Sequence, residues 1–250
     1  MSYEAELPGM KVSREQLRII SFRYHFASQF VEGKRVLEVG CGPGLGLGYL
    51  SRKAQRVIGS DYAEDNLRLA QQHYKGSVGL TLLDAHQLPF RDNCFGVVVA
   101  MAVAIYLQLD SFFSECCRVL EPGGTLVFCI PNQDQSGFQP SALSRNYFSV
   151  PELSGKMKRY FDARFYGAFP VAKEPPLAVR RGTVVFKIGN ALMLVPKGRE
   201  ISGFLSRLLH RSLILKEEIE EGIAADIKAE PIPGDCPNLQ YRVLYAVGTR

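Results

Sequence analysis

Short apolar runs alternate with amphipathic stretches along most of this chain. Runs such as 36–39, 94–107 and 125–130 are almost continuously apolar, which is typical of parallel strands covered on both faces. Residues 13–32 instead repeat apolar side chains at helical spacing, and Ser13 with Gln16 matches a capping box at the start of a helix. The pattern therefore predicts an α/β fold with a doubly wound sheet.

Four glycines follow the first apolar run in the sequence VLEVGCGPGLG at 36–46. Glycine tolerates positive φ and has no Cβ, so a glycine-rich turn between a strand and a helix predicts a nucleotide site. The glycine spacing of a dinucleotide fingerprint is absent at 40–46. Glu38 also suits a cationic ligand better than a pyrophosphate, so a dinucleotide is not the expected ligand.

Further acidic residues follow at the ends of later strands. Asp61 ends the run at 56–60, Asp84 ends the next, and the turn at 121–124 precedes the strand at 125–130. This order resembles that of the class I S-adenosylmethionine-dependent methyltransferases over residues 14–168 and 240–248. The resemblance implies a Rossmann-like seven-stranded sheet with an antiparallel last strand, S-adenosylmethionine as cofactor and S-adenosylhomocysteine as product.

The resemblance also implies roles for individual residues. Asp61 takes the position that accepts hydrogen bonds from ribose, although it also suits the N-cap of the next helix. Asp84 and Ala85 take the positions that contact adenine. The cofactor site implied in this way comprises Glu38, Gly40, Cys41, Gly42, Gly44, Asp61, Tyr62, Asp84, Ala85, His86 and Met101.

The chain is expected to form a single domain, 1–250, with two additions to the family pattern. Residues 1–32 form an N-terminal lid or helix, and residues 170–240 form an inserted α+β lid on the acceptor side, between strands six and seven. The insertion holds a predicted hairpin at 183–195 and an amphipathic helix at about 200–215. That helix could close over a small acceptor, touch a membrane surface or a lipid-linked acceptor, or simply carry solvated charges.

Composition adds three expectations. The net charge of +5 is mild, and the sequence after the fourth strand lacks the motif of base methyltransferases, so no nucleic-acid partner is expected. The six cysteines show no paired metal spacing, so no metal site is predicted. No leader pattern is evident at the N-terminus and the longest apolar run is too short to span a bilayer, which favours a cytoplasmic protein.

The expected reaction is methyl transfer by in-line displacement to a small-molecule, sugar or glycan, or lipid-linked acceptor. Relatives often carry two histidines after strand four, where this chain has Ile105 and Tyr106. The catalytic candidates are therefore Tyr106, His86 and Tyr24. A non-catalytic module that binds the cofactor for another subunit and, less favoured, an aminopropyl transferase remain alternatives. The acceptor atom and the oligomeric state stay open.

Overall fold

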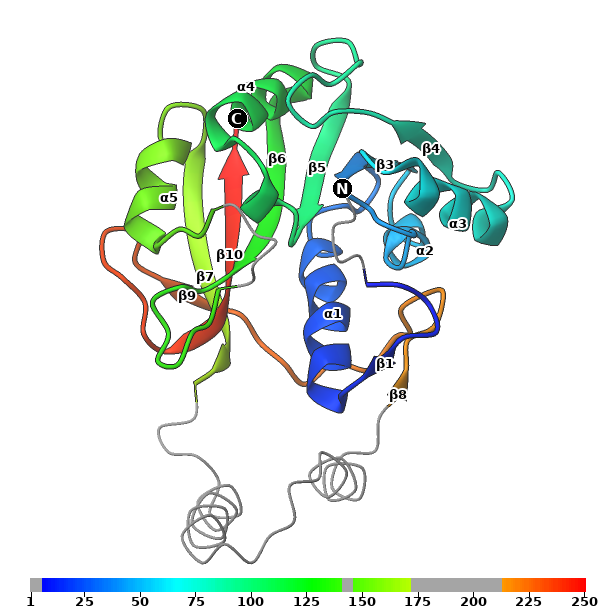
Figure 1. Ribbon diagram of the computed structural model, residues 1–250. Helices are drawn as coiled ribbons and strands as arrows, with labels where there is room; N and C mark the ends of the chain where they lie inside the picture. Colours follow the sequence, from blue (N-terminus) through cyan, green and yellow to red (C-terminus); the bar gives the residue numbers. More distant parts are fainter. Residues whose placement is uncertain (1–5, 141–145, 172–212) are drawn as a thin grey trace, which may run out of the picture.

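Eight strands form one mixed sheet in the order β4-β3-β2-β5-β6-β10-β7-β9 in the computed structural model, which describes residues 6–140, 146–171 and 213–250 (Figure 1). The strands from β4 to β6 are parallel, whereas β10 is antiparallel to both of its neighbours. This arrangement confirms the predicted Rossmann-like fold with an antiparallel last strand and adds an eighth strand. The strands are β2 (Arg35–Val39), β3 (Arg56–Asp61), β4 (Gly79–Leu82), β5 (Phe95–Met101), β6 (Leu120–Pro131), β7 (Asp162–Pro170), β9 (Glu230–Ile232) and β10 (Tyr241–Thr249).

Helices cover both faces of this sheet. On one face, α1 (Arg14–Ala27), α2 (Leu47–Ser51) and α3 (Glu64–Tyr74) contribute to one hydrophobic cluster. On the other face, α4 (Leu109–Val119) and α5 (Val150–Met157) contribute to a second cluster. The sheet is therefore the middle layer of a three-layer molecule, as a doubly wound fold requires.

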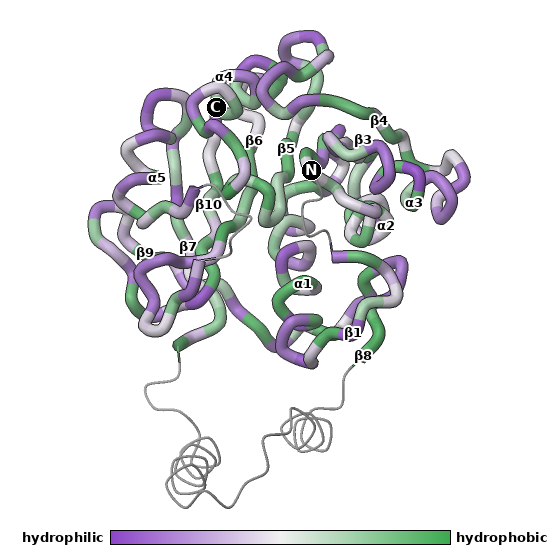
Figure 2. Tube along the Cα trace, in the orientation of Figure 1, coloured by the Kyte–Doolittle hydropathy of each residue, from purple (hydrophilic) through white to green (hydrophobic). Residues whose placement is uncertain are grey.

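The alternation of side chains along each strand explains the continuous apolar runs. Val36 belongs to the cluster under α1, whereas its neighbour Leu37 belongs to the cluster under α4, and both are fully buried. Figure 2 shows the same hydrophobic character along β5 and β6 at the centre of the sheet. The run that begins at Cys94 does not stay in the sheet, because β5 ends at Met101 and a 3-10 helix, η1 (Ala104–Tyr106), follows.

Helix α1 begins as predicted and ends earlier than predicted. The Ser13 hydroxyl accepts a hydrogen bond from the backbone N–H of Gln16, and the Gln16 side chain accepts one from the Ser13 N–H. The predicted helix extends to residue 32, but α1 ends at Ala27. The N–H groups of Gln29 and Phe30 bond to carbonyls only three residues back, so tight turns replace the helix there.

The described ends of the insertion join the rest of the fold in two places. Strand β8 (Leu213–Ile214) pairs with β1 (Lys11–Val12), so the predicted helix at 200–215 is wrong over its last residues. The cause is a backbone ladder in which the Leu215 N–H donates to the Met10 carbonyl at 2.9 Å.

Strand β9 then adds an edge to the main sheet beside β7. The predicted hairpin at 183–195 and most of the predicted helix lie outside the described residues. Within the described ranges, no helix has both the length and the apolar character needed to cross a bilayer.

Candidate functional site

The turn that follows β2 is shaped by glycines at positions where other residues would not fit. Gly42 has a φ of +56°, and no atom lies within 4 Å of the position that a Cβ would take. At Gly46 a Cβ would lie 1.8 Å from the ring of Tyr24 on α1. The loop is therefore closed by Tyr24 at its helical end and leaves open space beside the backbone at Gly42.

Asp61 at the end of β3 holds the open part of this loop. Its Oδ2 accepts a hydrogen bond of 2.8 Å from the Gly42 N–H. Its Oδ1 accepts bonds from the Ala63 N–H at 2.8 Å and from the Asn66 side chain at 3.2 Å. The parallel pairing of β2 with β3 brings the two strand ends together, as the sequence predicts. The carboxylate thus orders both the glycine loop and the start of α3.

Glu38 lies inside the fold beneath the glycine loop. It is completely buried, and its Oε1 accepts a hydrogen bond of 2.9 Å from the Tyr24 hydroxyl. Burial raises the pKa of Glu38 to about 7, although the hydrogen bond from Tyr24 opposes the rise. Burial and the nearby Glu38 also raise the pKa of Tyr24 well above its ordinary value, so Tyr24 stays a hydrogen-bond donor.

The second carboxylate oxygen of Glu38 shows whether these residues suit the cofactor that the resemblance implies. Glu38 Oε2 is buried and has no hydrogen-bond partner in the described structure. A buried carboxylate oxygen without a donor is costly, and a ligand ammonium would supply that donor. The open backbone at Gly42 and the carboxylate of Asp61 lie on either side of the same turn. These residues therefore fit the aminoacyl and ribose parts of S-adenosylmethionine.

Asp84 and His86 form a closed hydrogen-bonded pair beyond the end of β4. Asp84 Oδ1 accepts bonds from the His86 N–H at 2.9 Å and from His86 Nδ1 at 2.6 Å. These contacts lower the pKa of Asp84, with the backbone bond as the main cause. His86 Nε2 accepts the Gln108 N–H at 3.0 Å, so Nδ1 is the ring nitrogen that donates to Asp84. Both nitrogens are engaged, so the ring is a poor candidate for a general base in this arrangement.

The other predicted site residues are spread around the same edge of the sheet. Tyr62 is 71% exposed and stands beside Asp61. The side chain of Val103, two residues beyond Met101, packs on Gly40, so the segment that leads to the half-buried Tyr106 touches the glycine loop. Besides Glu38, four members of the predicted set are buried: Cys41, Gly44, Ala85 and Met101. The roles assigned to these residues stay predictions.

One segment of this site was missed by the sequence analysis. Residues 215–227 of the insertion, which we call the strap, contact α1, the end of α2 and α3. The Ile219 N–H donates to the Leu45 carbonyl in the glycine loop at 3.0 Å, and Ile219 is buried. Glu218 Oε1 forms a hydrogen bond of 2.8 Å with His73 Nε2 on α3. The acidic run at 217–221 marked the strap in the sequence, but nothing in that run indicated where it packs.

Comparisons with known proteins agree on the fold and on the core of the chain. A family model described as a methyltransferase domain matches residues 37–128. A structure from Thermotoga maritima, described as an S-adenosylmethionine-dependent methyltransferase and possible histamine N-methyltransferase, superposes with a TM-score of 0.58 at 15% identity. That likeness covers 94% of this chain and 93% of the other, and at such low identity it shows the fold alone.

Two curated relatives match a shorter part. The phthiotriol/phenolphthiotriol dimycocerosates methyltransferase 1 of Mycobacterium ulcerans (strain Agy99) is 36% identical over 136 residues, 51% of this chain and 50% of that protein. The fatty-acid O-methyltransferase of Mycolicibacterium smegmatis is 37% identical over 136 residues, 50% of this chain and 49% of that protein. The chain thus spans about half the length of the curated relatives it matches.

Proposed function

We propose that this protein, whose residues 37–128 match a family model described as a methyltransferase domain, is a class I S-adenosylmethionine-dependent enzyme that transfers a methyl group from that cofactor to a lipid or other small-molecule acceptor. The single observation that carries the proposal is the buried Glu38 beneath the open turn at Gly42, with Asp61 bonded to the same turn. A sugar or glycan acceptor, the broader expectation from the sequence, remains within the small-molecule class.

The residues would share the binding of the cofactor as follows. Glu38 would pair with the ammonium, the backbone at Gly42 would lie along the aminoacyl part, and Asp61 would accept hydrogen bonds from ribose. Asp84 and Ala85 would hold adenine. The cofactor supplies an electrophilic methyl group on a sulfonium, and the main contribution of the chain is to orient an acceptor toward it.

A lipid acceptor has the strongest support from the comparisons. The names of both curated relatives refer to lipids, a dimycocerosate and a fatty acid. Tyr106 on η1 is the residue that we assign to the acceptor side, since the segment from Val103 to Tyr106 begins in contact with Gly40. Both nitrogens of His86 are engaged, which argues against this histidine as the base.

Calorimetry and a turnover assay together test the proposal. We expect S-adenosylmethionine and S-adenosylhomocysteine to bind and NAD not to bind. Release of S-adenosylhomocysteine in the presence of fatty acids, hydroxylated lipids or glycans would then identify the acceptor class. Binding without turnover across the whole panel would favour the non-catalytic module, and no binding of either cofactor form would refute the proposal.

A Tyr106→Phe variant separates the acceptor side from the cofactor side. We expect this variant to bind S-adenosylhomocysteine like the parent protein and to lose methyl transfer. Equal loss of cofactor binding would place Tyr106 in the cofactor site instead. Tyr160→Phe, a change on the half-buried ring beyond α5, serves as the matched control for loss of a tyrosine hydroxyl.

A further inference from the structure

The connection from β4 to β5 leaves part of the sheet without a helical cover. Residues 83–94 contain no helix, whereas α4 and α5 pack against β6 and β7 on the same side. Ile58 on β3 faces this side and is only half-buried, although it packs against the cluster under α4. The loop, rather than a helix, thus covers the first half of β2 and β3.

A cavity of about 290 Å³ lies between this loop and the two strands. Its apolar side chains include Ile58 from β3, Phe90 from the loop and Phe95 from β5. The rings of Phe90 and Phe95 meet edge to face with centroids 5.0 Å apart. The inner surface of the cavity is therefore apolar, and two aromatic rings fix its shape.

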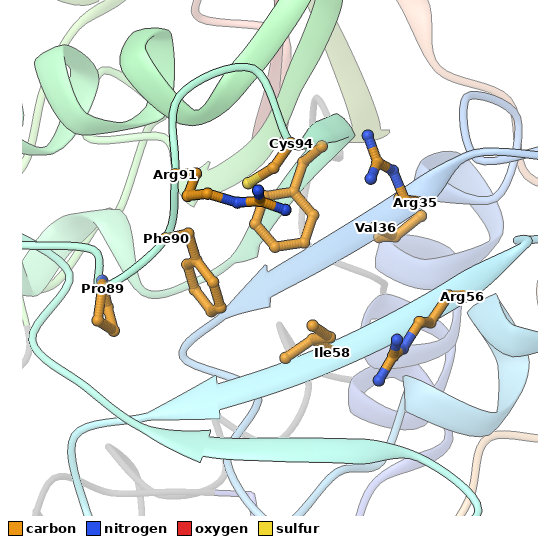
Figure 3. A pocket seen from close by; sticks show the side chains of 9 residues that line it. Arg35, Val36, Arg56, Ile58, Pro89, Phe90, Arg91 and Cys94 are labelled. Carbon is orange, nitrogen blue, oxygen red and sulfur yellow. The ribbon is translucent and has the colours of Figure 1, made fainter.

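Three arginines stand around this apolar surface. Arg35 and Arg56 begin neighbouring strands and are paired in the sheet register, while Arg91 comes from the loop. Figure 3 shows the three arginine side chains around the cavity, together with Ile58 and Phe90. Arg35 makes an ion pair of 2.6 Å with Glu121. Within the described residues, no carboxylate lies within ion-pair distance of Arg56 or Arg91, so the cavity carries an excess of positive charge.

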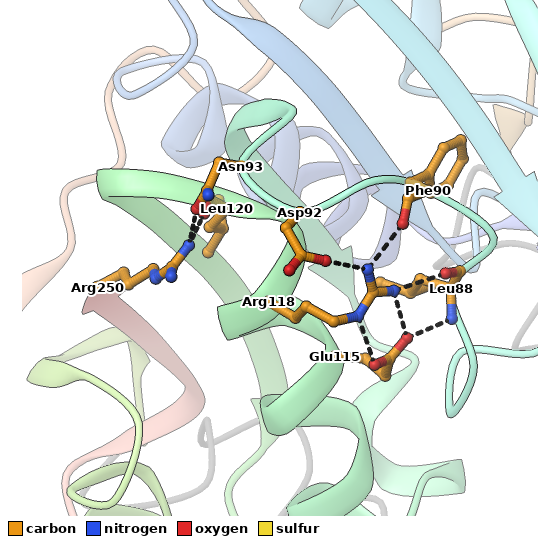
Figure 4. A network of polar contacts seen from close by, with 8 residues as sticks. All are labelled: Leu88, Phe90, Asp92, Asn93, Glu115, Arg118, Leu120 and Arg250. Carbon is orange, nitrogen blue, oxygen red and sulfur yellow. Dashed lines mark hydrogen bonds and ion pairs between the residues drawn. The ribbon is translucent and has the colours of Figure 1, made fainter.

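The loop that closes the cavity is fixed in place by Arg118 on α4. Arg118 Nη1 donates to the Phe90 carbonyl at 2.7 Å and to Asp92 at 2.8 Å, and Nη2 donates to the Leu88 carbonyl at 2.8 Å (Figure 4). Glu115 on the same helix also binds the loop, because its carboxylate accepts a hydrogen bond of 2.8 Å from the Leu88 N–H. A guanidinium that satisfies two loop carbonyls and two carboxylates holds the loop rigidly, so the cavity is formed before any ligand enters.

The arginines near the cavity also act on the thiol of Cys94. Partial burial raises the pKa of the Cys94 thiol, and the charges of Arg35, Arg91 and Arg118 oppose that rise. The same charges that favour a thiolate would favour a bound anion.

We propose that this cavity binds an organic anion in which a carboxylate or phosphate head is attached to a short apolar body. The head would lie among Arg35, Arg56 and Arg91, and the body would lie against Ile58 and Phe90. The volume is at the small end of the range of about 300–1,000 Å³ for small-molecule sites, which limits the body to a short chain or a single ring.

This site is distinct from the glycine loop and goes beyond the proposed methyl transfer. Arg35 is at the start of β2 and Gly40 follows its end, so the two sites lie at opposite ends of that strand. Five residues of strand span about 16 Å. A ligand bound among the arginines would therefore not touch the glycine loop.

Calorimetry with four probes tests the chemical class. We expect octyl phosphate and octanoate to bind, and octanol and inorganic phosphate to bind at least tenfold more weakly. Whichever head binds more tightly identifies the natural head group. Inorganic phosphate that binds as tightly as octyl phosphate would overturn the amphipathic class.

Variants locate the binding, since an octyl chain could also enter an acceptor site. Arg56→Gln and Arg91→Gln should each weaken the binding of octyl phosphate about ten- to a hundredfold, which is the effect of losing one charged hydrogen bond. Arg68→Gln, on the exposed side of α3, is the matched control and should bind like the parent. Equal affinity of all three variants would overturn the proposal, and unchanged binding of S-adenosylhomocysteine would confirm that each variant is folded.

Alkylation of Cys94 gives a second readout on the parent protein. Octyl phosphate should slow the modification of Cys94 by N-ethylmaleimide, as followed by mass spectrometry, while the exposed Cys236 reacts at the same rate. Equal modification of Cys94 with and without octyl phosphate would contradict binding in this cavity.

Discussion

The backbone N–H of Ile219 donates a hydrogen bond of 3.0 Å to the carbonyl oxygen of Leu45, which joins the strap to the glycine loop. The contact is reinforced nearby, because Arg52 pairs with Glu221 at 2.7 Å and Arg18 pairs with Asp226 at 2.5 Å. The residues that return from the insertion are therefore part of the packing around the proposed cofactor site.

Ile219→Ala should destabilise the protein and loosen this loop. The side chain is 2% exposed, and removing a buried isoleucine to alanine typically costs about 2–5 kcal/mol of unfolding free energy. Urea unfolding measures the loss, and calorimetry should show weaker binding of S-adenosylhomocysteine. Ile214→Ala, at a site that is 65% exposed, is the control and should change little. Equal effects of the two changes would contradict the packing of the strap.

The stability of the free protein should depend on the protonation of Glu38. Its pKa is raised from 4.5 to about 7 by burial, so the folded state holds a proton that the unfolded state releases. The stabilisation is fully present below about pH 4.5 and is lost as the pH rises to about 7, a change on the order of 3 kcal/mol. Glu38→Gln should remove this part of the pH dependence in urea unfolding. An unchanged slope between pH 5 and 7 in the variant would contradict the assignment.

Cofactor affinity should change with pH in the opposite direction. A ligand ammonium favours ionised Glu38, so S-adenosylmethionine should bind more tightly as the pH rises toward and past 7, and binding should release a proton. Calorimetry in buffers of different ionisation enthalpy measures that proton. Glu38→Gln should bind about ten- to a hundredfold more weakly, with no proton release tied to this position.

Asp61→Ala should both weaken the binding of the cofactor and loosen the glycine loop. The variant loses the bond to the Gly42 N–H as well as the proposed contact to ribose. We expect the variant to bind S-adenosylhomocysteine about ten- to a hundredfold more weakly, which is the effect of losing a charged hydrogen bond. Asp65, on the helix α3 that follows, has a side chain that is 92% exposed, and Asp65→Ala should bind normally. An unchanged dissociation constant for Asp61→Ala would remove the ribose assignment.

Gly46→Ala should disturb the site because its methyl group would meet the ring of Tyr24. The clash at 1.8 Å can be relieved only if α1 or the loop moves, which would also break the bond from Tyr24 to Glu38. Thermal unfolding should show a clear loss of stability. Gly155→Ala, in α5 with open space around it, is a glycine-to-alanine control that should be neutral or stabilising by about 0.5–1 kcal/mol. A stable Gly46→Ala variant with normal cofactor affinity would contradict this account.

The sequence predicted the features that depend on local pattern and on strand order. Asp61 follows a strand end and Gly42 follows the neighbouring one, so parallel pairing alone brings them together. The antiparallel pairing of β10 was predicted from the family resemblance, and the apolar pattern at 240–248 fitted that expectation.

Other contacts could not be predicted because no local pattern encodes them. The bond from Ile219 to Leu45 joins segments far apart in the sequence, and the acidic run around Ile219 has no period. Nothing in the sequence around His86 indicated that both of its ring nitrogens form hydrogen bonds within the protein. Leu213 and Ile214 continued a helical pattern, yet pairing with Lys11 and Val12 made them a strand. Tertiary pairing outweighed local propensity there.

The position of β10 between β6 and β7 has a consequence for how the chain is completed during synthesis. Strands β7 and β9 reach the rest of the sheet only through β10, so they have no edge to join until residues 241–249 have left the ribosome. The earlier strands can assemble first, because β2 to β6 pair among themselves. We expect a nascent chain that stops before residue 241 to leave β6 as an unpaired edge, open to association with other chains.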